Sequence, residues 1–222
     1  MKIVKLYLVI VFLSFHFNAK TQNEVLSKIP VSGKNIQSFI PAKYDTMQVE
    51  RGDLNKDGKE DVVLALKHAD EDTFEMDEEP PRLLIVLLKT NDGYVIGGKS
   101  DKILMCVHCG GVFGDPFANI SITKNVLEIS HYGGSNWRWS NSKKFRHQNS
   151  AMVLIGSTED SFWTLSDCNG KGVGTYGRSY KDINYQTGEQ EIIEYDKCKL
   201  KKHLKIKKTK EPLIKLEEFE YE

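Results

Sequence analysis

The sequence of 222 residues lacks the features that mark several large protein classes. After its first residues no segment is long and apolar enough to cross a membrane, and no heptad pattern or low-complexity region occurs. Neither sign of charge is in excess, because 31 Lys and Arg residues stand against 31 Asp and Glu residues. This balance argues against a nucleic-acid-binding protein, which would carry a clear excess of positive charge.

Short signatures of common hydrolases are also missing. Neither Gly-x-Ser-x-Gly nor His-Glu-x-x-His occurs. A hydrolase needs a nucleophile or paired carboxylates beside a positioned base. The sequence therefore favours a protein without catalytic activity. The alternative is an envelope hydrolase that uses Asp115, His131 and Arg138, which only the fold would bring together.

Residues 1–21 have the layout of a secretory signal peptide. Lys2 and Lys5 form a basic start, residues 6–15 are apolar, and residues 18–21 offer a processing site. The apolar run is too short to span a bilayer. No lipobox cysteine follows, so we expect a secreted or periplasmic protein without a lipid anchor. The remaining chain of about 200 residues is long enough for one domain with a substantial core.

The four cysteines, Cys106, Cys109, Cys168 and Cys198, all lie in the predicted domain of residues 22–222. An even number of cysteines in an exported protein favours disulfides. Three pairings are possible, and we favour Cys168–Cys198 with Cys106–Cys109 as a local loop. The alternatives are redox chemistry at the Cys-Val-His-Cys segment and a zinc site of all four cysteines.

From Met47 onward the pattern of the chain is that of β-structure. Residues 62–66 and 83–88 are apolar at successive positions, which predicts central strands that are covered on both faces. Asn91-Asp92-Gly93 is a strong signal for a hairpin between two strands. Short strands and turns alternate through most of the remaining chain. We therefore predict a mainly β protein with antiparallel sheets, arranged as a sandwich or a partial propeller.

The strongest chemical signal is the loop of residues 52–61, which reads Gly-Asp-Leu-Asn-Lys-Asp-Gly-Lys-Glu-Asp. Oxygen-bearing side chains occur at alternate positions, and a glycine stands at the bend. Ca²⁺ binds roughly six to eight oxygens, and this spacing lets one short loop supply most of them. The predicted ligands are the side chains of Asp53, Asn55, Asp57 and Asp61 and the backbone carbonyl of Lys59.

This loop and the apolar run after it resemble the calcium loop of FG-GAP or VCBS-type repeats, which form blades of β-propellers. The resemblance covers residues 49–99 and implies a structural Ca²⁺ within a propeller-blade-like unit. An EF-hand is excluded because its twelfth position, which needs a bidentate carboxylate, is Leu64. A propeller needs about four to eight blades, and the pattern occurs once. We therefore expect a single blade-like unit inside another β-fold; an Asx-rich turn without metal is the alternative.

A second candidate site is the segment His-Tyr-Gly-Gly-Ser-Asn-Trp-Arg-Trp at residues 131–139. Its two tryptophans share one strand face and can stack on sugar rings, while the arginine points the other way. The alternative is that both tryptophans belong to the core and the glycines let strands approach closely. His131 shares the face of apolar residues, so we expect a core histidine. The candidate ligand-binding residues are Asp115, Asn136, Trp137, Arg138 and Trp139.

Residues 106–117 and 131–139 also resemble segments of a group of uncharacterised exported bacterial proteins, and this resemblance implies no particular activity. Taken together, the sequence predicts an exported, non-catalytic binding or structural module of the bacterial envelope. The expected partner is an envelope glycan or protein, and the expected cofactor is one structural Ca²⁺.

Overall fold

The computed structural model describes residues 24–75, 78–172 and 174–221, so the signal-peptide prediction for residues 1–21 lies outside the described residues. Within the described residues, helical structure is limited to the short helix α1 (Glu24–Lys28) and the 3₁₀ turns η1 (Ile36–Phe39), η2 (Glu71–Thr73) and η3 (Leu216–Glu218). The strands are β1 (Ser32–Gly33), β2 (Tyr44–Gly52), β3 (Asp61–His68), β4 (Leu83–Lys89), β5 (Tyr94–Ser100), β6 (Phe117–Thr123), β7 (Val126–Gly134), β8 (Trp137–Gln148), β9 (Ala151–Trp163), β10 (Gly177–Asn184), β11 (Glu189–Asp196) and β12 (Lys199–Lys207).

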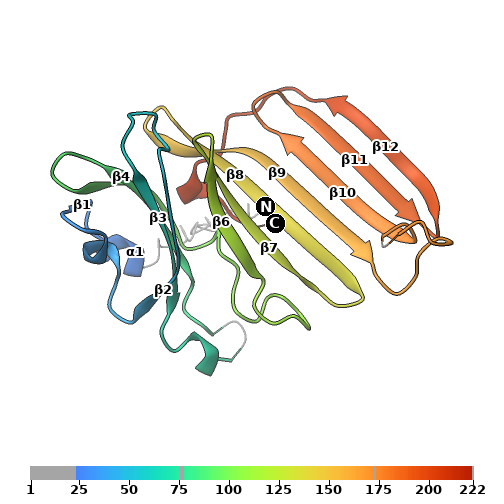
Figure 1. The fold of residues 1–222 in the computed structure, drawn as a ribbon, viewed down its shortest axis with the longest axis horizontal. Coiled ribbons are helices and arrows are strands. Elements are labelled where there is room, and N and C mark those ends of the chain that lie inside the picture. Colours follow the sequence, from blue (N-terminus) through green and yellow to red (C-terminus); the bar gives the residue numbers. More distant parts are fainter. Residues whose placement is uncertain (1–23, 76–77, 173, 222) are drawn as a thin grey trace, which may run out of the picture.

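These strands form two antiparallel sheets (Figure 1). The first sheet has five strands in the order β1-β5-β4-β3-β2, and the second has seven in the order β12-β11-β10-β9-β8-β7-β6. Strands β6 to β12 therefore form an uninterrupted meander, in which each strand pairs with its neighbour in sequence. The mainly β, antiparallel prediction is confirmed. The described strands close into neither a barrel nor a propeller.

The main core lies between the two sheets. Side chains of β3 and β4 in the first sheet meet side chains of β6 to β9 in the second, and all are almost completely buried. The contributing residues are Val63, Ala65, Leu84, Val86, Ile120, Leu127, Ile129, Phe145, Met152 and Leu154. We call the face of the second sheet that carries these residues its inner face.

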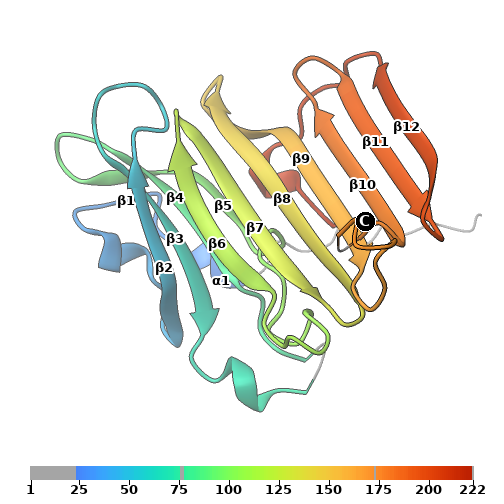
Figure 2. The same ribbon diagram turned by 45° about the vertical axis from the view of Figure 1, so that its right-hand side comes forward.

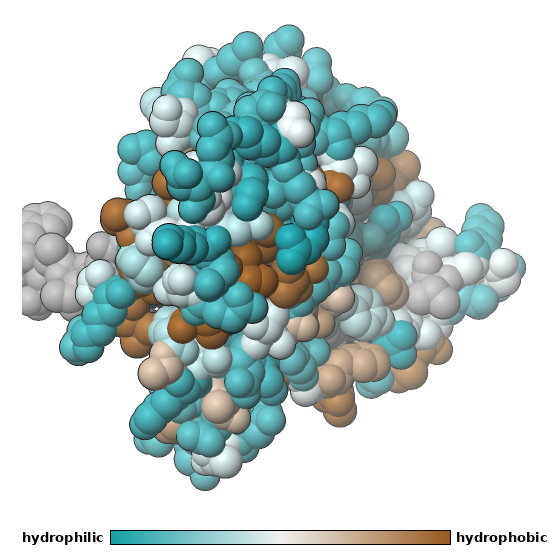
Figure 3. All heavy atoms as spheres, turned by 60° about the vertical axis from the view of Figure 1, so that its left-hand side comes forward, coloured by the Kyte–Doolittle hydropathy of each residue, from teal (hydrophilic) through white to brown (hydrophobic). Residues whose placement is uncertain are grey.

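A second core covers the opposite face of the first sheet. Here Val62, Leu64, Leu83 and Ile85 pack against the N-terminal segment that contains α1 and η1. Strands β3 and β4 are thus buried on both faces, as the apolar runs at residues 62–66 and 83–88 predicted. Figure 3 shows this side of the molecule as mostly hydrophilic, with small, separated apolar areas. The N-terminal segment therefore covers a surface that would otherwise be strongly apolar.

The second sheet is wider than the first. Strands β10 to β12 extend beyond the sandwich, as Figures 1 and 2 show. Long charged side chains line this extension, including the bidentate pair of Arg178 and Asp160 and the pair of Lys202 and Glu194. Cross-strand ion pairs of this kind suit a sheet that faces water. The extension therefore offers surface that the packing of the core does not need.

At one edge of the molecule, the side chain of Gln48 links the two sheets through hydrogen bonds of the kind that a neighbouring strand would make. Gln48 lies at an irregularity in β2, and its amide donates to the carbonyl of Ile120 (2.7 Å) and accepts from the Ile120 N–H (3.0 Å). Both backbone groups of a buried residue in β6 are thereby satisfied without a partner strand. One glutamine thus links β2 and β6 where the backbone ladder stops.

Replacing Gln48 by Ala should destabilise the fold by about 1–3 kcal/mol, because the two backbone groups of Ile120 lose their partners in a buried position. Chemical denaturation measures the change. Gln37→Ala, at an exposed position of η1, is the matched control and should alter stability by less than about 0.5 kcal/mol. Equal stability of the two variants would show that water replaces the amide at no cost.

Candidate ligand-binding face

The predicted calcium loop is closed by hydrogen bonds from its own backbone. The Asp53 carboxylate accepts from the N–H groups of Lys56 (2.6 Å), Asp57 (3.2 Å) and Gly58 (3.0 Å). Asn55 Oδ1 accepts from the Asp57 N–H (3.0 Å), and Asp57 Oδ1 accepts from the Lys59 N–H (2.8 Å). Consecutive Asx turns of this kind hold a loop in shape through local contacts alone. The loop is therefore ordered by the same oxygens that were predicted to bind the ion.

Asp61 has a role that differs from the predicted one. Its side chain is 0% exposed, and its carboxylate accepts from the N–H groups of Leu54 (2.8 Å), Asn55 (3.4 Å) and Lys89 (2.8 Å). Burial raises the pKa of Asp61, and these three bonds oppose that rise. Asp61 thus fastens the loop to the end of β4 from the inside.

The loop's donor chemistry suits Ca²⁺, and its oxygens bind the loop's own backbone. In the described parts of the chain, no group of three or more His, Cys, Asp or Glu side chains is placed to hold a metal. Each carboxylate or amide oxygen has two lone pairs, so Asp53, Asn55 and Asp57 retain accepting capacity on the solvent side. Calcium binding stays a prediction, with these three side chains and the Lys59 carbonyl as its remaining donors.

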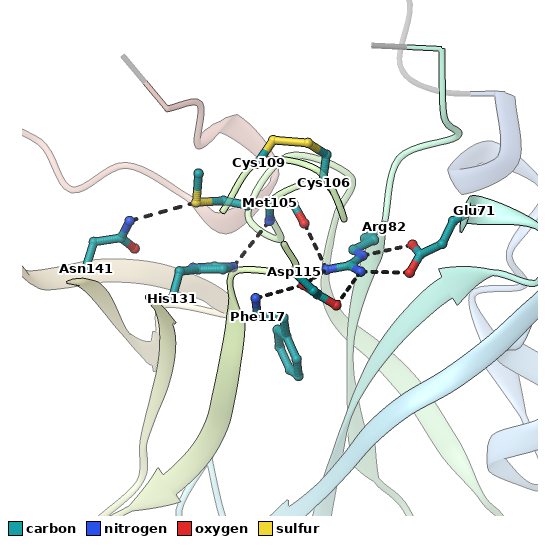
Figure 4. The surroundings of a disulfide bond; sticks show 9 residues. All are labelled: Glu71, Arg82, Met105, Cys106, Cys109, Asp115, Phe117, His131 and Asn141. Atoms are coloured by element: carbon teal, nitrogen blue, oxygen red, sulfur yellow. Dashed lines mark hydrogen bonds and ion pairs between the residues drawn. A yellow bond between two sulfur atoms is a disulfide. The ribbon is translucent and has the colours of Figure 1, made fainter. Parts of the chain in front are cut away.

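Asp115, a predicted ligand-binding residue, belongs to an ion network around the buried Arg82 (Figure 4), and its own side chain is 41% exposed. The guanidinium binds Glu71 in η2 (2.9 and 2.7 Å) and Asp115 (2.7 and 2.7 Å), and it donates to the Met105 carbonyl (3.1 Å). All five N–H donors of Arg82 are therefore used. Burial lowers the pKa of Arg82, but the bonds to Glu71 and Asp115 outweigh this effect and raise it. The network joins three loops and leaves Asp115 little freedom to bind a ligand.

His131 is a core residue with both ring nitrogens occupied. Nε2 accepts from the Met105 N–H (3.2 Å), which assigns the ring proton to Nδ1, and Nδ1 faces the Tyr221 hydroxyl (3.3 Å). That hydroxyl donates to the Ile103 carbonyl (3.2 Å). Burial lowers the pKa of His131 to about 4. The expectation of a satisfied core histidine agrees with this geometry, and a general base would need an open face.

Arg138 lies on the opposite face of the second sheet. Its guanidinium covers the ring of Phe113 at 4.9 Å and donates to the Tyr132 hydroxyl (3.1 Å). The predicted hydrolase residues Asp115, His131 and Arg138 are thus an ion-paired carboxylate, a buried neutral ring and a cation on another face. The structure therefore does not bring these three side chains together in one open pocket.

The cysteines form two disulfides, Cys106–Cys109 and Cys168–Cys198, and no cysteine is free. The favoured pairing is confirmed, which leaves no thiolates for a zinc site. Disulfides persist in oxidising compartments, so the chain belongs outside the cytoplasm. Among the residues that the structure describes, no helix is long and apolar enough to cross a membrane.

The glycines of the 131–139 segment allow a close backbone contact. Gly134 N–H donates to the Gly110 carbonyl (2.8 Å), and Val112 N–H donates to the Gly134 carbonyl (3.1 Å). A Cβ added at Gly133 would lie 2.6 Å from the Trp139 ring and 2.8 Å from the Gly110 carbonyl oxygen. The interpretation of these glycines as sites of close approach therefore holds, and Trp139 packs over one of them.

Trp137 is different, because its side chain stays 47% exposed. Its ring centroid lies 5.6 Å from that of Trp163, which in turn lies 6.5 Å from Tyr176. A Cβ added at Gly177 would lie 2.7 Å from the Trp137 ring, so this ring rests directly on the backbone of β10. Three aromatic side chains thus form a partly open surface at one end of the inner face.

The aromatic surface continues along the inner face into a groove. The register of β8 and β9 pairs Trp137 with Trp163, Trp139 with Ser161, Asn141 with Glu159 and Lys143 with Ser157. Side chains two residues apart on a strand point to the same face. All four pairs therefore project to one side of the sheet, from the aromatic end toward the core.

The groove has a volume of about 440 Å³, and a neighbouring hollow adds about 270 Å³. Lys143 is buried and binds Glu159 (2.7 Å), whereas the Oδ1 atom of Asn141 is buried without a hydrogen-bond partner. The C-terminal segment forms the other wall of the groove and contributes Ile214, Phe219 and Tyr221. Sequence reasoning missed this groove; the available signal was the three-residue spacing of Leu213, Leu216 and Phe219, which predicts a segment that docks on the core.

Of the five predicted ligand-binding residues, the structure brings two to this face, Trp137 and Trp139. Asn136 lies at the turn before them, and its carbonyl accepts from the Thr164 N–H (2.9 Å) and hydroxyl (3.0 Å). Comparisons with protein-family models, with curated proteins and with solved structures found no match for this chain. Its function must therefore be argued from the arrangement of its own residues.

The buried His131 predicts how stability depends on pH. The unfolded ring takes up a proton near pH 6.5 but the folded ring only near pH 4, so stability is complete above pH 6.5 and is lost as the pH falls toward 4. The difference between these two values corresponds to a loss of about 3 kcal/mol. The Asn141 side chain and Asp115 raise the pKa of His131 and so oppose burial, whereas Arg82 and Lys143 lower it further.

Denaturation at pH 7.5 and pH 4 should therefore show a smaller pH dependence in His131→Phe than in the parent chain. His147→Phe, which removes a half-buried histidine of the neighbouring strand β8, is the control and should keep most of the parent's pH dependence. An unchanged dependence in His131→Phe would mean that the ring is charged in the folded protein.

Proposed function

We propose that this chain is an exported, non-catalytic binding module of the bacterial envelope, and that it holds a glycan on the inner face of its second sheet. The observation that carries the proposal is the exposed ring of Trp137, supported by Trp163 and Tyr176 and continuous with the groove. An indole has a large apolar face, which can stack on the apolar face of a sugar ring. Sites of this kind combine such surfaces with a few fixed polar groups.

The aromatic surface is held rigidly, which lowers the entropic cost of binding. Trp137 and Trp163 occupy opposite positions in the paired strands β8 and β9. Tyr176 lies in the loop before β10, and its carbonyl accepts from the Cys198 N–H (3.1 Å). The Cys168–Cys198 disulfide ties the same loop to the start of β12. The rings therefore keep their spacing in the absence of ligand.

The groove supplies the polar partners that hydroxyl groups need. Asn141 offers an unused acceptor, and Glu159 and Lys181 line the opening. Asn141 lies four positions after Trp137, a distance of about 14 Å along a strand at roughly 3.4 Å per residue. A site of this length suits an oligosaccharide better than a single sugar. The buried, unpartnered acceptor is the group whose satisfaction would favour a hydroxylated ligand most strongly.

Binding is a better interpretation than glycoside hydrolysis. The two carboxylates that line the groove, Glu159 and Glu220, form ion pairs with Lys143 and Lys102. A glycosidase needs one carboxyl group held in its protonated form, and a lysine partner favours the ionised form. Both acids therefore suit the fixing of a ligand rather than the transfer of a proton to it.

The first sheet has a supporting role in this proposal. Its strands β2, β3, β4 and β5 are consecutive and antiparallel, and the Asp-rich loop joins β2 to β3. This order is what the resemblance to FG-GAP or VCBS-type repeats implies for residues 49–99. We assign the unit a structural function, with Ca²⁺ bound on the solvent side of the loop by Asp53, Asn55 and Asp57.

Trp137→Ala should weaken the binding of isolated peptidoglycan or envelope polysaccharide by about 30-fold, because truncation of a central aromatic anchor costs about 2 kcal/mol. Trp163→Ala should act in the same direction. Phe113→Ala is the matched control, because Phe113 is an exposed aromatic residue that packs with Arg138 on the other face. Calorimetry or sedimentation with the insoluble glycan measures the affinities, and melting curves check the fold. Equal binding by all three variants would refute the glycan site.

The calcium assignment predicts that millimolar Ca²⁺ raises the melting temperature by a few degrees. Extracellular sites bind at about 10⁻⁴–10⁻³ M, so the gain in stability is about 1 kcal/mol. Asp57→Ala should abolish this rise, whereas Glu60→Ala, an exposed acid of the same loop, should keep it. Asp61→Asn should destabilise the protein with or without calcium, because that carboxylate holds three backbone N–H groups. No rise in the parent chain would leave the loop as an Asx-rich turn.

A further inference from the structure

Strand β12 is a free edge of the second sheet. It pairs with β11 on one side, and no described strand pairs with its other side. Figures 1 and 2 show it as the strand farthest from the first sheet. Seven of its nine residues are exposed. A large, flat partner can therefore reach this strand without any change in the fold.

The edge carries a strong and partly uncompensated positive charge. Residues 197–210 contain eight lysines, one histidine and no acidic residue, although the whole chain has a net charge of zero. Acidic residues of β11 neutralise part of this charge through the ion pairs Glu189–Lys207, Glu191–Lys205, Glu194–Lys202 and Asp196–Lys201. Four exposed lysines form no ion pair with any described residue: Lys197, Lys199, Lys208 and Lys210. Two of them lie at each end of the strand.

Apolar side chains stand between these lysines. Leu200 is 52% exposed and Leu204 is 41% exposed. Lysines keep an edge strand from pairing with other chains, and here the two exposed leucines stand among them. The edge presents ammonium groups and hydrocarbon side by side, which is the composition of segments that lie in the interface of a lipid bilayer.

We infer that β12 and its flanking lysines dock this protein on an anionic phospholipid surface. The strand meets the lipid with its free edge, and the ε-ammonium groups bind lipid phosphates. Leu200 lies opposite Tyr195 and Leu204 opposite Ile192, so the two leucines flank this edge on opposite faces of the sheet and contact the boundary between headgroups and acyl chains from both sides. Lysine suits this position because its long apolar stem lies along hydrocarbon while its charge stays in water. The inference does not depend on the glycan site, which lies on other strands.

A second copy of the chain fits this edge poorly. Antiparallel pairing of two β12 strands would place a lysine-rich strand against another, and like charges opposite each other destabilise a sheet. An acidic polypeptide would satisfy the lysines but would leave Leu200 and Leu204 in water. Lipid is the occupant that uses both kinds of side chain.

Co-sedimentation of the full chain with vesicles tests the inference. Vesicles of phosphatidylglycerol mixed with phosphatidylcholine should bind the protein, and binding should weaken as salt is added. Replacing Lys197, Lys199, Lys208 and Lys210 together by Gln should lower the affinity about 600-fold, since each lysine near such a surface contributes about fivefold. The matched control replaces Lys34, Lys56, Lys124 and Lys171 by Gln. These are also exposed and form no ion pair with a described residue, so the change in net charge is the same.

Two further variants separate lipid from other ligands. Leu204→Ser should weaken vesicle binding about tenfold, whereas Leu165→Ser, at an exposed leucine in the loop before β10, should not. Trp137→Ala should bind vesicles as well as the parent chain, even if the glycan proposal fails. Equal vesicle binding by the two quadruple-lysine variants would overturn the inference. Binding to poly-glutamate that the β12 variant loses, without binding to anionic vesicles, would also overturn it.

Discussion

The two-sided burial of β3 and β4 is the constraint on which the rest of the structure depends. Their side chains alternate between two apolar faces, and neither face can remain in water. Each fully buried aliphatic side chain contributes about 1.5–3 kcal/mol, so both faces need a cover. The second sheet covers one face and the N-terminal segment the other. Because these strands need only β6 to β9 as a partner layer, the strands beyond them are free to carry polar surface.

Three kinds of polar contact fix the loops around this core. Gln48 replaces a missing strand at the junction of the sheets, Asp61 holds the Asp-rich loop from inside, and Arg82 joins three loops with five hydrogen bonds. Each contact uses nearly all the hydrogen-bonding capacity of its side chain. Removal of one partner would leave buried charges or backbone groups unpaired, which costs more than the pair itself contributes. These residues are therefore fully committed to structure.

The sequence allowed much of the fold to be predicted, because the deciding patterns are local. The central strands follow from the apolar runs at residues 62–66 and 83–88, and the hairpin follows from Asn91-Asp92-Gly93. The disulfides follow from the even number of cysteines. The candidate site was harder. Trp137 could be singled out, but its partners are Trp163, from a strand whose register no local pattern reveals, and Tyr176, from the loop before β10. The contact between Arg82 and Asp115, 33 residues apart, likewise depends on how two sheets pack.

The residues whose hydrogen-bonding groups are all used also help to locate the function. A side chain whose bonds are all used, such as Arg82 or His131, has nothing left to offer a ligand. What remains is an exposed indole, the unpartnered oxygen of Asn141 and the lysines at the free edge. The first two lie along the inner face, and the lysines lie on β12, at the far end of the same sheet. One sheet thus carries two separate surfaces, so the glycan that we propose for the inner face and the lipid that we infer for the edge would not compete for the same residues.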